Sequence, residues 1–364
     1  MRLIINCRFL TQRITGVQRF AFEMCKELDS LLYNHSGLEV IGLMPEREIN
    51  EQYRGYVFKS IQIKSCGRLS GHLWEQLELP IYSRGILLIN LCNTAPLFKL
   101  KQCITLHDVI FMTNQDSQKL WFKLWYRLIA RVTSLSAQTI FTVSQFSKAE
   151  IVRLLEVNAD RVVVLGNAPS LQNYTYANDV LTRFNLGGKK YFLMIGSNSV
   201  RKNTQMVAKL FASDPALHDT MLVIVGGKYV NLVAVDDIAA VNLLYTDYIS
   251  DSELRSLYAH AEALIFPSLY EGFGIPLLEA MAESTIVIAS DIQVIREVCA
   301  NNALYFAPYS TNSLKQQIIS RLSSSDELLL ELKDKALVQL INYQWAKFAK
   351  IMLETIYIRM YKIK

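Results

Sequence analysis

The 364-residue sequence lacks several features that would each assign it to a different class of protein. It has no run of about 18 uninterrupted apolar residues, so we expect no membrane-spanning helix. The opening residues, Met1 to Asn6, form too short an apolar stretch for a signal peptide and are typical of a first β-strand. No G-x-G-x-x-G motif follows the first strand of either domain predicted below, which disfavours an NAD-dependent oxidoreductase.

Cysteine usage, charge and the lack of metal motifs narrow the function further. The six cysteines lie far apart and form no C-x-x-C pair, which is typical of a reducing compartment. The formal net charge is only +5, and no run of like charges indicates nucleic acid as a partner. No Asp-x-Asp pair and no His/Cys cluster with ligand spacing occurs, so we expect neither a metal nor a cofactor. These features predict a cytoplasmic protein.

Short apolar segments alternate with longer amphipathic segments along the chain, in two series. The predicted strands of the first series are residues 3–6, 40–44, 86–91, 104–106, 139–143 and 162–165. Those of the second series are residues 191–195, 221–225, 243–245, 263–266, 286–289 and 304–306. The alternation predicts an α/β fold of two Rossmann-like, doubly wound domains. The turn-rich segment from Asn167 to Lys190 marks the linker, so we assign residues 1–170 and 171–343 to the two domains.

The strongest functional signal follows the predicted strand 263–266 of the second domain. There the chain reads Glu271-Gly-Phe-Gly-Ile-Pro276-Leu-Leu-Glu279. Gly272 and Gly274 allow the backbone to approach a ligand closely, and Pro276 suits the first turn of a helix. We expect the amides of Leu277 and Leu278 to be unpaired and, with the helix dipole, to favour a phosphate group. The segment therefore predicts a site for a nucleotide sugar.

Two carboxylates frame this glycine loop. Glu279 can accept hydrogen bonds from two neighbouring ribose hydroxyls, and Glu271 on the loop can reach hydroxyls of the sugar. A second interpretation stays open on physical grounds, in which Glu279 only complements the helix dipole and Glu271 is solvated.

The stretch from Glu271 to Glu279 resembles the E-x7-E motif of retaining glycosyltransferases of family 4, which have the two-domain GT-B architecture. The framing residues S-x-Y-E-G-F-G-I-P-x-x-E-A make the match specific, and the resemblance extends over nearly the whole chain. It implies two Rossmann-like domains that face each other across a cleft. It also implies that a terminal helix, within residues 344–364, crosses back onto the first domain.

Further motifs carry the same resemblance. Arg201 and Lys202 lie on a strand-to-helix loop that opens at Gly196, and two adjacent cations can neutralise a diphosphate, although such pairs are more often only solvated. The family has a similar Arg-Lys-Asn, assigned to the donor's diphosphate. Tyr248 and Ile249 resemble the segment that packs against the nucleobase, and a capping box follows them at Ser250 and Glu253.

In the first domain, His107 and Asp108 end a predicted strand. The histidine could donate to a sugar hydroxyl or a phosphate, while Asp108 could orient it or bind the acceptor. A satisfied histidine packed beside its aspartate is equally compatible with the residues alone, but the family's own His-Asp pair favours the active-site interpretation. Gly16 lies in a stretch that looks like the family's first glycine loop, which opens a helix.

The resemblance thus assigns a site to numbered residues. The catalytic residues would be His107, Arg201, Lys202 and Glu271. The donor would contact Gly16, Gly196, Arg201, Lys202, Tyr248, Ile249, Glu271, Gly272, Phe273, Gly274, Leu277, Leu278 and Glu279. The acceptor would contact Asn93 and Asp108, and no metal is expected.

Two segments, Leu73–Pro80 and Asn93–Pro96, look like family members that build O-antigen and other bacterial surface polysaccharides, including mannosyltransferases. This implies transfer of a hexose, with GDP-mannose favoured as the donor, to a glycan or an undecaprenyl-diphosphate-linked acceptor. No side chain stands out as a covalent nucleophile, which is compatible with the front-face route proposed for the family. Two alternatives stay open: an epimerase or phosphorylase of similar fold, and a non-catalytic module that binds nucleotide or glycan.

The predicted helix at residues 117–131 combines aromatic residues with cations. This composition suits a membrane interface, where rings lie at headgroup depth and cations meet anionic lipid. Aromatic residues at helical spacing are also typical of a packed core. The sequence leaves open whether this helix touches the inner face of the cell membrane.

Overall fold

Each series of apolar segments forms its own parallel β-sheet, because strands that are buried on both faces consist mostly of apolar residues. The structure is a computed structural model, and it describes residues 2–33, 37–113, 120–177, 179–196, 199–226 and 238–361. The described residues divide into two units. The first unit comprises Met1–Met112, Lys123–Asn167 and Gln344–Lys364, and the second comprises Thr113–Phe122 and Ala168–Tyr343.

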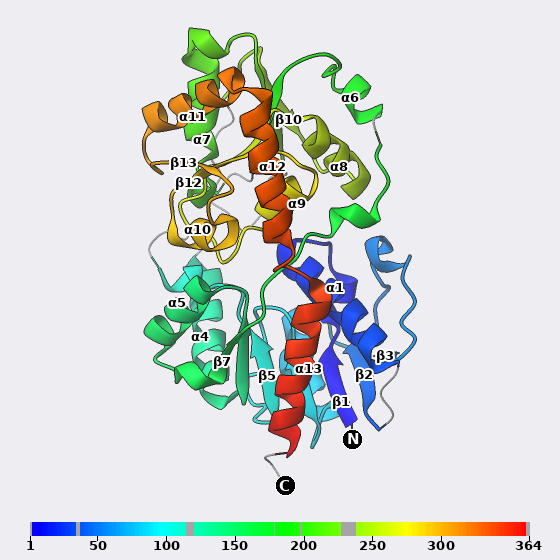
Figure 1. The fold of residues 1–364 in the computed structure, drawn as a ribbon. Helices are drawn as coiled ribbons and strands as arrows, with labels where there is room; N and C mark the ends of the chain where they lie inside the picture. Colours follow the sequence, from blue (N-terminus) through cyan, green and yellow to red (C-terminus); the bar gives the residue numbers. More distant parts are fainter. Residues whose placement is uncertain are drawn as a thin grey trace. The chain divides into compact units, whose positions relative to one another are not determined.

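The first unit contains a seven-stranded parallel sheet in the order β3-β2-β1-β4-β5-β6-β7 (Figure 1). Its strands are β1 (Arg2–Asn6), β2 (Glu39–Met44), β3 (Ile61–Ser65), β4 (Leu87–Asn90), β5 (Gln102–Thr105), β6 (Thr139–Thr142) and β7 (Val162–Val164). Ile4 of β1 lies opposite Ile41 on one side and Leu88 on the other, so the sheet centre is apolar. Its longer helices are α1 (Gly16–Leu32), α4 (Leu120–Ser136, of which this unit contains the part from Lys123 onward), α5 (Gln145–Leu155) and α13 (Trp345–Tyr361). Short segments α2 (Gly71–Leu73) and α3 (Leu79–Tyr82) are joined by a π-helical turn, Trp74–Glu78.

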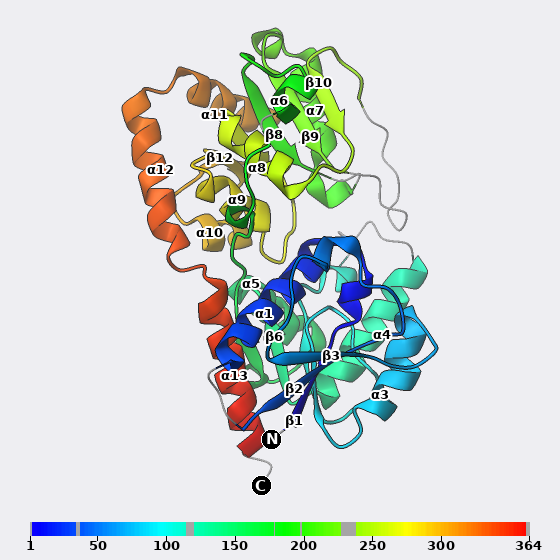
Figure 2. The same ribbon diagram turned by 90° about the vertical axis from the view of Figure 1, so that its right-hand side faces the viewer.

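The terminal helix α13 packs against α1 within the first unit, and the two run side by side in Figures 1 and 2. The rings of Phe20 and Trp345 meet edge to face at 5.8 Å. Phe348 fills the space over Gly166, where a Cβ would clash with its ring and where the backbone φ is +110°. Residues of α1, early in the sequence, and of α13, late in the sequence, therefore pack into one hydrophobic core.

The second unit contains a six-stranded parallel sheet in the order β10-β9-β8-β11-β12-β13. Its strands are β8 (Tyr191–Ile195), β9 (Met221–Val225), β10 (Leu243–Thr246), β11 (Ala263–Phe266), β12 (Val287–Ser290) and β13 (Leu304–Phe306). Its helices are α6 (Asp179–Arg183), α7 (Thr204–Ser213), α8 (Asp251–His260), α9 (Ile275–Ala282), α10 (Gln293–Cys299), α11 (Thr311–Ser323) and α12 (Asp326–Leu340). The core contains Phe192, Phe211, Ile265 and Ile288.

Both units have the doubly wound α/β architecture that the sequence predicts. Because all strands of a sheet run parallel, the loops that follow them gather at one edge, where ligands of such sheets bind. None of the helices in the described ranges combines the length and hydrophobicity needed to cross a lipid bilayer.

Candidate functional site

Two loops of the second unit bring the predicted cationic and acidic residues together. The 3₁₀ helix η7 (Val200–Lys202) follows β8, and the glycine loop follows β11, the next strand in the sheet. The amide of Leu269 donates to the carbonyl oxygen of Arg201 at 2.7 Å, which fastens the two loops to each other. Residues about 70 positions apart in sequence therefore share one site.

Glu271 lies between the two cations. Its Oε1 is 2.7 Å from Nζ of Lys202, and its Oε2 is 3.0 Å from Nη1 of Arg201. Burial alone would raise the pKa of Glu271, but the charges of Lys202 and Arg201 lower it to about 2. The carboxylate is therefore ionised at neutral pH. Two cations therefore share this one carboxylate.

Further contacts hold the two cations in place. Nη1 of Arg201 also donates to the carbonyl oxygen of Tyr270 at 3.2 Å. Nζ of Lys202 lies 5.0 Å from the centroid of the Phe266 ring, within the range of a cation–π contact. The interpretation of Glu271 as a solvated side chain is wrong, since the residue is only 7% exposed and both of its oxygens face cations. Its contact with a sugar hydroxyl stays a prediction.

Gly274 sets the geometry at the start of α9. Its φ is +103°, and a Cβ at this position would lie 2.8 Å from Cδ1 of Leu277, so the site requires glycine. Pro276 occupies the first turn of the helix, as predicted. The expected unpaired amide is wrong for Leu277, whose N–H donates to the carbonyl oxygen of Gly274 at 3.0 Å. The side chains of Leu277, Leu278 and Phe273 are buried in the unit.

Glu279 is buried on the same helix. Only 6% of the residue is exposed, and its Oε2 accepts a hydrogen bond from the hydroxyl of Tyr258 on α8 at 3.2 Å. A carboxylate that only complemented the helix dipole could do so while hydrated at the surface, so its burial would cost free energy with nothing gained. The arrangement is typical of a side chain held in one orientation.

The remaining predicted donor residues of the second unit lie at the same edge of its sheet. Gly196 follows β8, and a Cβ at Gly226, which follows β9, would collide with the Gly196 carbonyl. Tyr248 is half exposed and Ile249 is buried in the loop after β10. The predicted capping box at the start of α8 is confirmed: Ser250 Oγ accepts from the Glu253 amide, and the Glu253 carboxylate accepts from the Ser250 amide.

In the first unit, His107 follows β5 and is nearly buried. Its Nε2 lies 3.0 Å from the carbonyl oxygen of Leu91, and the Phe20 ring packs edge to face at 4.7 Å. Burial lowers the pKa of His107 to about 4, so the ring is neutral at pH 7 and its Nε2–H donates to that carbonyl. The hydrogen-bonded partner is thus Leu91 rather than Asp108, and donation from Nε2 to a sugar would first have to break this bond.

The neighbouring polar side chains support the same loops. Asn93 Oδ1 accepts from the His107 amide at 2.7 Å, and Asp108 Oδ1 accepts from the Ile110 amide at 3.1 Å. Gly16 is the first residue of α1, so the predicted glycine loop does open a helix.

A buried polar network in the first unit was not predicted. Asn6 at the end of β1 donates to Oε1 of Glu75 at 2.9 Å and to Oδ1 of Asn90 at 3.0 Å. Nε of Arg8 lies 3.4 Å from the same Glu75 oxygen, and Nη2 of Arg8 donates to Thr94 at 3.0 Å. Burial would raise the pKa of Glu75, but Arg8 and His72 together hold it below its usual value. The sequence did contain a signal for this network. An asparagine ends each of two apolar strands, Asn6 in β1 and Asn90 in β4.

The segments Leu73–Pro80 and Asn93–Pro96, which the family resemblance alone connected, contact each other in the structure. Gln76 donates to the carbonyl oxygen of Ala95 at 3.0 Å and accepts from the amide of Leu97 at 2.9 Å. Thr94 donates to Glu75 at 3.0 Å. The segment Leu73–Pro80 thus positions the loop that contains Asn93.

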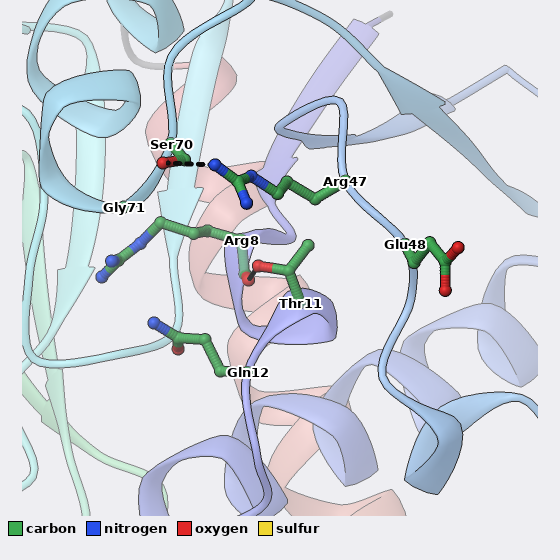
Figure 3. Close-up of a pocket in the computed structure, with 7 residues that line it drawn as sticks. All are labelled: Arg8, Thr11, Gln12, Arg47, Glu48, Ser70 and Gly71. Atoms are coloured by element: carbon green, nitrogen blue, oxygen red, sulfur yellow. Dashed lines mark hydrogen bonds between the residues drawn. The ribbon is translucent and has the colours of Figure 1, made fainter.

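Arg8 also borders a pocket of about 510 Å³ at the edge where β1, β2 and β3 end (Figure 3). The pocket is lined by Arg8, Thr11, Gln12, Arg47, Glu48, Ser70 and Gly71. In the ranges that the structure describes, no group of three or more His, Cys, Asp and Glu side chains is placed to hold a metal ion.

Residues 183–338 match the protein family described as "Glycosyl transferases group 1". This part of the chain is similar to the glycosyl transferases group 1 family. Every predicted donor residue other than Gly16 lies inside the matched segment. The predicted family relationship is therefore confirmed.

Two relatives that match this chain are named as mannosyltransferases. The chain is 30% identical over 232 residues to the O-antigen chain mannosyltransferase RfbU of Salmonella typhimurium, an alignment covering 62% of each chain. It is 29% identical over 178 residues to the GDP-mannose:cellobiosyl-diphosphopolyprenol alpha-mannosyltransferase of Komagataeibacter xylinus, covering 47% of this chain and 43% of that one. The matches thus span less than two thirds of these relatives.

Solved structures extend the similarity to both units. The Anabaena protein Alr3699/HepE, in complex with UDP and glucose, has a TM-score of 0.72 at 12% identity, over 98% of this chain and 99% of that chain. WaaG, a glycosyltransferase involved in lipopolysaccharide biosynthesis, has a TM-score of 0.67 at 15% identity, over 97% and 98%. At these identities the similarity concerns the fold, and the GT-B prediction is confirmed.

Proposed function

We propose that this protein is a retaining mannosyltransferase that transfers mannose from GDP-mannose to a glycan acceptor in the synthesis of a bacterial surface polysaccharide. The observation that carries the proposal is the cluster of Arg201, Lys202 and Glu271, in which two cations share one carboxylate. It lies beside the glycine loop at the edge of the sheet where nucleotides bind in such folds. The choice of mannose follows the relatives named above.

The chemistry of the cluster suits departure of a nucleoside diphosphate. Negative charge grows on the leaving phosphate as the glycosidic bond breaks, and fixed cations beside it stabilise that charge. Glu271 keeps both cations in place before the donor arrives, so little reorganisation is needed during the reaction. The proposed mechanism therefore uses Arg201 and Lys202 in place of a metal ion. Retention follows from the resemblance to family 4.

The acceptor is assigned to the first unit, with Asn93 and Asp108 as contacts. We propose an undecaprenyl-diphosphate-linked or free glycan as the acceptor and the cytoplasm as the compartment, since nucleotide sugars are the donor.

A donor screen tests the function. Purified protein is incubated with GDP-mannose, UDP-glucose and other sugar nucleotides in the presence of a polyprenyl-diphosphate-linked acceptor, and the product is examined by mass spectrometry and NMR. We expect a glycan lengthened by one hexose with the donor's anomeric configuration. An inverted product would contradict retention, an epimer or sugar phosphate would favour the epimerase or phosphorylase, and nucleotide binding without turnover would favour a non-catalytic module.

We also propose peripheral contact of helix α4 and the segment from α2 to α3 with an anionic lipid surface. Helix α4 exposes Leu120, Trp121, Leu124 and Leu128 along one side, with Trp121 83% exposed. The segment from α2 to α3 exposes Leu73, Leu77 and Ile81 at the same four-residue spacing. Helix α4 and the segment from α2 to α3 are in contact, since the ring centroids of His72 and Trp125 lie 6.0 Å apart. Arg131 on α4 is exposed, as amphipathic membrane-binding helices require.

The structure divides the aromatic residues of this helix between two environments. Trp125 and Tyr126 are half-buried beside His72, whereas Trp121 is exposed. Arg127 is occupied, because its Nε donates to the carbonyl oxygen of Phe111 at 2.6 Å. The start of the predicted helix, residues 117–119, lies outside the described residues.

Vesicle sedimentation tests the membrane contact. Wild-type protein should bind vesicles that contain phosphatidylglycerol more strongly than vesicles of phosphatidylcholine alone. Trp121→Ser and Leu77→Ser should weaken this binding, while Leu337→Ser, at an exposed leucine of α12 in the second unit, serves as the control. Equal binding by all variants would contradict the proposed surface.

A further inference from the structure

The pocket of the first unit carries an inference about the acceptor. We propose that the pocket between Arg8 and Arg47 binds the phosphate groups of a diphosphate-linked acceptor. This inference rests on the proposed function for the identity of the ligand, but the pocket's preference for an anion follows from its own hydrogen-bonding groups. Neither Asn93 nor Asp108, which the sequence assigned to the acceptor, lines the pocket.

The charges around the pocket do not cancel. Arg8 is neutralised by the buried Glu75, at 3.4 Å, and Glu48 at the rim is neutralised by Arg54, at 3.1 Å. Arg47 is paired with no carboxylate in the described ranges of the chain, and its Nη2 donates only to Ser70 Oγ at 3.1 Å. One positive charge is left over, which favours a negatively charged ligand.

Several polar groups that line the pocket can each donate a further hydrogen bond to a ligand. Among the described residues, no hydrogen-bond acceptor is assigned to Nη1 of Arg8, to Nη1 of Arg47 or to Nε2 of Gln12. The oxygen of the Gln12 amide is already used, because it accepts from Gln18 Nε2 at 3.1 Å. The Ser70 hydroxyl accepts from Arg47, which leaves its hydrogen available to a ligand. Phosphate oxygens accept hydrogen bonds and cannot donate when ionised, so they match this set.

The positions of these groups fit one ligand. Figure 3 shows the guanidinium of Arg8 and the amide of Gln12 on one side of the pocket and the carboxylate of Glu48 pointing away. Arg8 is held in place by the buried network around Asn6 and Glu75, so its free N–H is fixed before a ligand arrives. Arg47 is exposed, and its guanidinium is held toward Ser70 by their hydrogen bond. The volume of about 510 Å³ accommodates a sugar phosphate rather than a bare phosphate ion.

A binding experiment tests the pocket without reference to turnover. Inorganic pyrophosphate is titrated into protein with Arg201→Ala and Lys202→Ala, so that the predicted donor site no longer competes, and binding is measured by calorimetry. Adding Arg47→Gln should weaken the remaining binding about ten-fold or more, since a charge-assisted hydrogen bond is lost. Gln12→Glu should weaken it further by charge repulsion. Arg2→Gln, at the opposite end of β1, removes the same charge and should have no effect. Equal binding by the Arg47 and Arg2 variants would overturn the proposal.

Kinetics with the donor site intact identify the ligand. Arg47→Gln should raise KM for a diphosphate-linked acceptor about ten-fold while leaving KM for the donor and for a neutral glycoside acceptor unchanged. A raised KM for the donor would reassign the pocket to the donor, and loss of vesicle binding with an unchanged acceptor KM would reassign it to a lipid headgroup; either result overturns the proposal. If no transfer occurs with any donor while pyrophosphate binding still depends on Arg47, the proposed function fails and the anion site stands.

Discussion

The carboxylate of Glu271 lies 2.7 Å from the ammonium group of Lys202, and this pair joins the loop after β11 to the loop after β8. Glu271 is ionised throughout the neutral range, because its pKa is lowered to about 2. Its first effect is to fix the position of Lys202 and Arg201. A substitution at Glu271 therefore changes the two cations as well as any contact with the sugar.

Replacing Arg201 or Lys202 by alanine should lower kcat by about a hundred-fold or more with the fold intact, because we propose that each cation stabilises charge that grows in the transition state. Steady-state kinetics with saturating donor and acceptor measure the effect, and circular dichroism checks folding. Lys209→Ala, at an exposed lysine of α7, is the matched control. If both variants retained wild-type activity, the cations would have no part in the mechanism.

Glu271→Gln and Glu279→Gln should differ in their kinetics. Glu271→Gln loosens the cation cluster beside the transferred group, so we expect a lower kcat together with a higher donor KM. Glu279 is proposed to hold the ribose equally well before and during the reaction, so Glu279→Gln should mainly raise donor KM. Initial rates over a range of donor concentrations at saturating acceptor separate the two parameters. The reverse pattern would exchange the roles of the two residues.

The stability of the first unit should depend on pH through His107. Its folded pKa of about 4 lies below the value of about 6.5 for an unfolded histidine. The unfolded chain binds the proton first, so the free energy of unfolding should fall as the pH decreases from about 6.5 toward 4. Urea unfolding at pH 7.5 and pH 5 measures this, and His107→Gln should reduce the difference. NMR titration of the ring near pH 6.5 would contradict the lowered pKa.

Glu75→Gln should destabilise the protein by about 3 kcal/mol, because it leaves the charge of Arg8 buried without its partner. Equilibrium unfolding in urea measures the loss. Glu39→Gln breaks an exposed ion pair with Arg2 and should cost less than about 1 kcal/mol. Equal losses in the two variants would show that the network around Asn6 contributes nothing beyond a surface pair.

Chelation should leave the activity unchanged, because we assign the charge of the leaving group to Arg201 and Lys202. Activity is compared before and after treatment with EDTA, followed by removal of the chelator. Loss of activity that only Mg²⁺ or Mn²⁺ restores would show that the reaction needs a metal ion.

The strands could be predicted from the sequence where they are buried on both faces. Residues 191–195, 221–225 and 263–266 match β8, β9 and β11 to the residue, since such strands are short apolar runs. Strand β3 was missed. It lies at the edge of its sheet, where Gln62 and Lys64 face solvent and interrupt the apolar pattern.

Local capping was predictable only where the motif was unambiguous. Ser250 and Glu253 form the capping box expected at the start of α8. Ser147 and Glu150 have the same spacing but do not cap a helix, because the N-cap of α5 is Ser144, whose Oγ accepts from the Ser147 amide at 2.9 Å. Ser147 instead donates to the carbonyl oxygen of His107 at 3.0 Å. The second serine is three residues away, so spacing alone could not choose between them.

The sequence by itself determined the two parallel sheets and the glycine-dependent start of α9, because these depend on apolar periodicity and local backbone conformation. Only the tertiary structure decided which groups meet. Glu271 pairs with cations 69 and 70 positions earlier, His107 with the Leu91 carbonyl, and Asn6 with both Glu75 and Asn90. Parallel strands bring distant loops to one edge, and the sequence does not record which side chains become neighbours there.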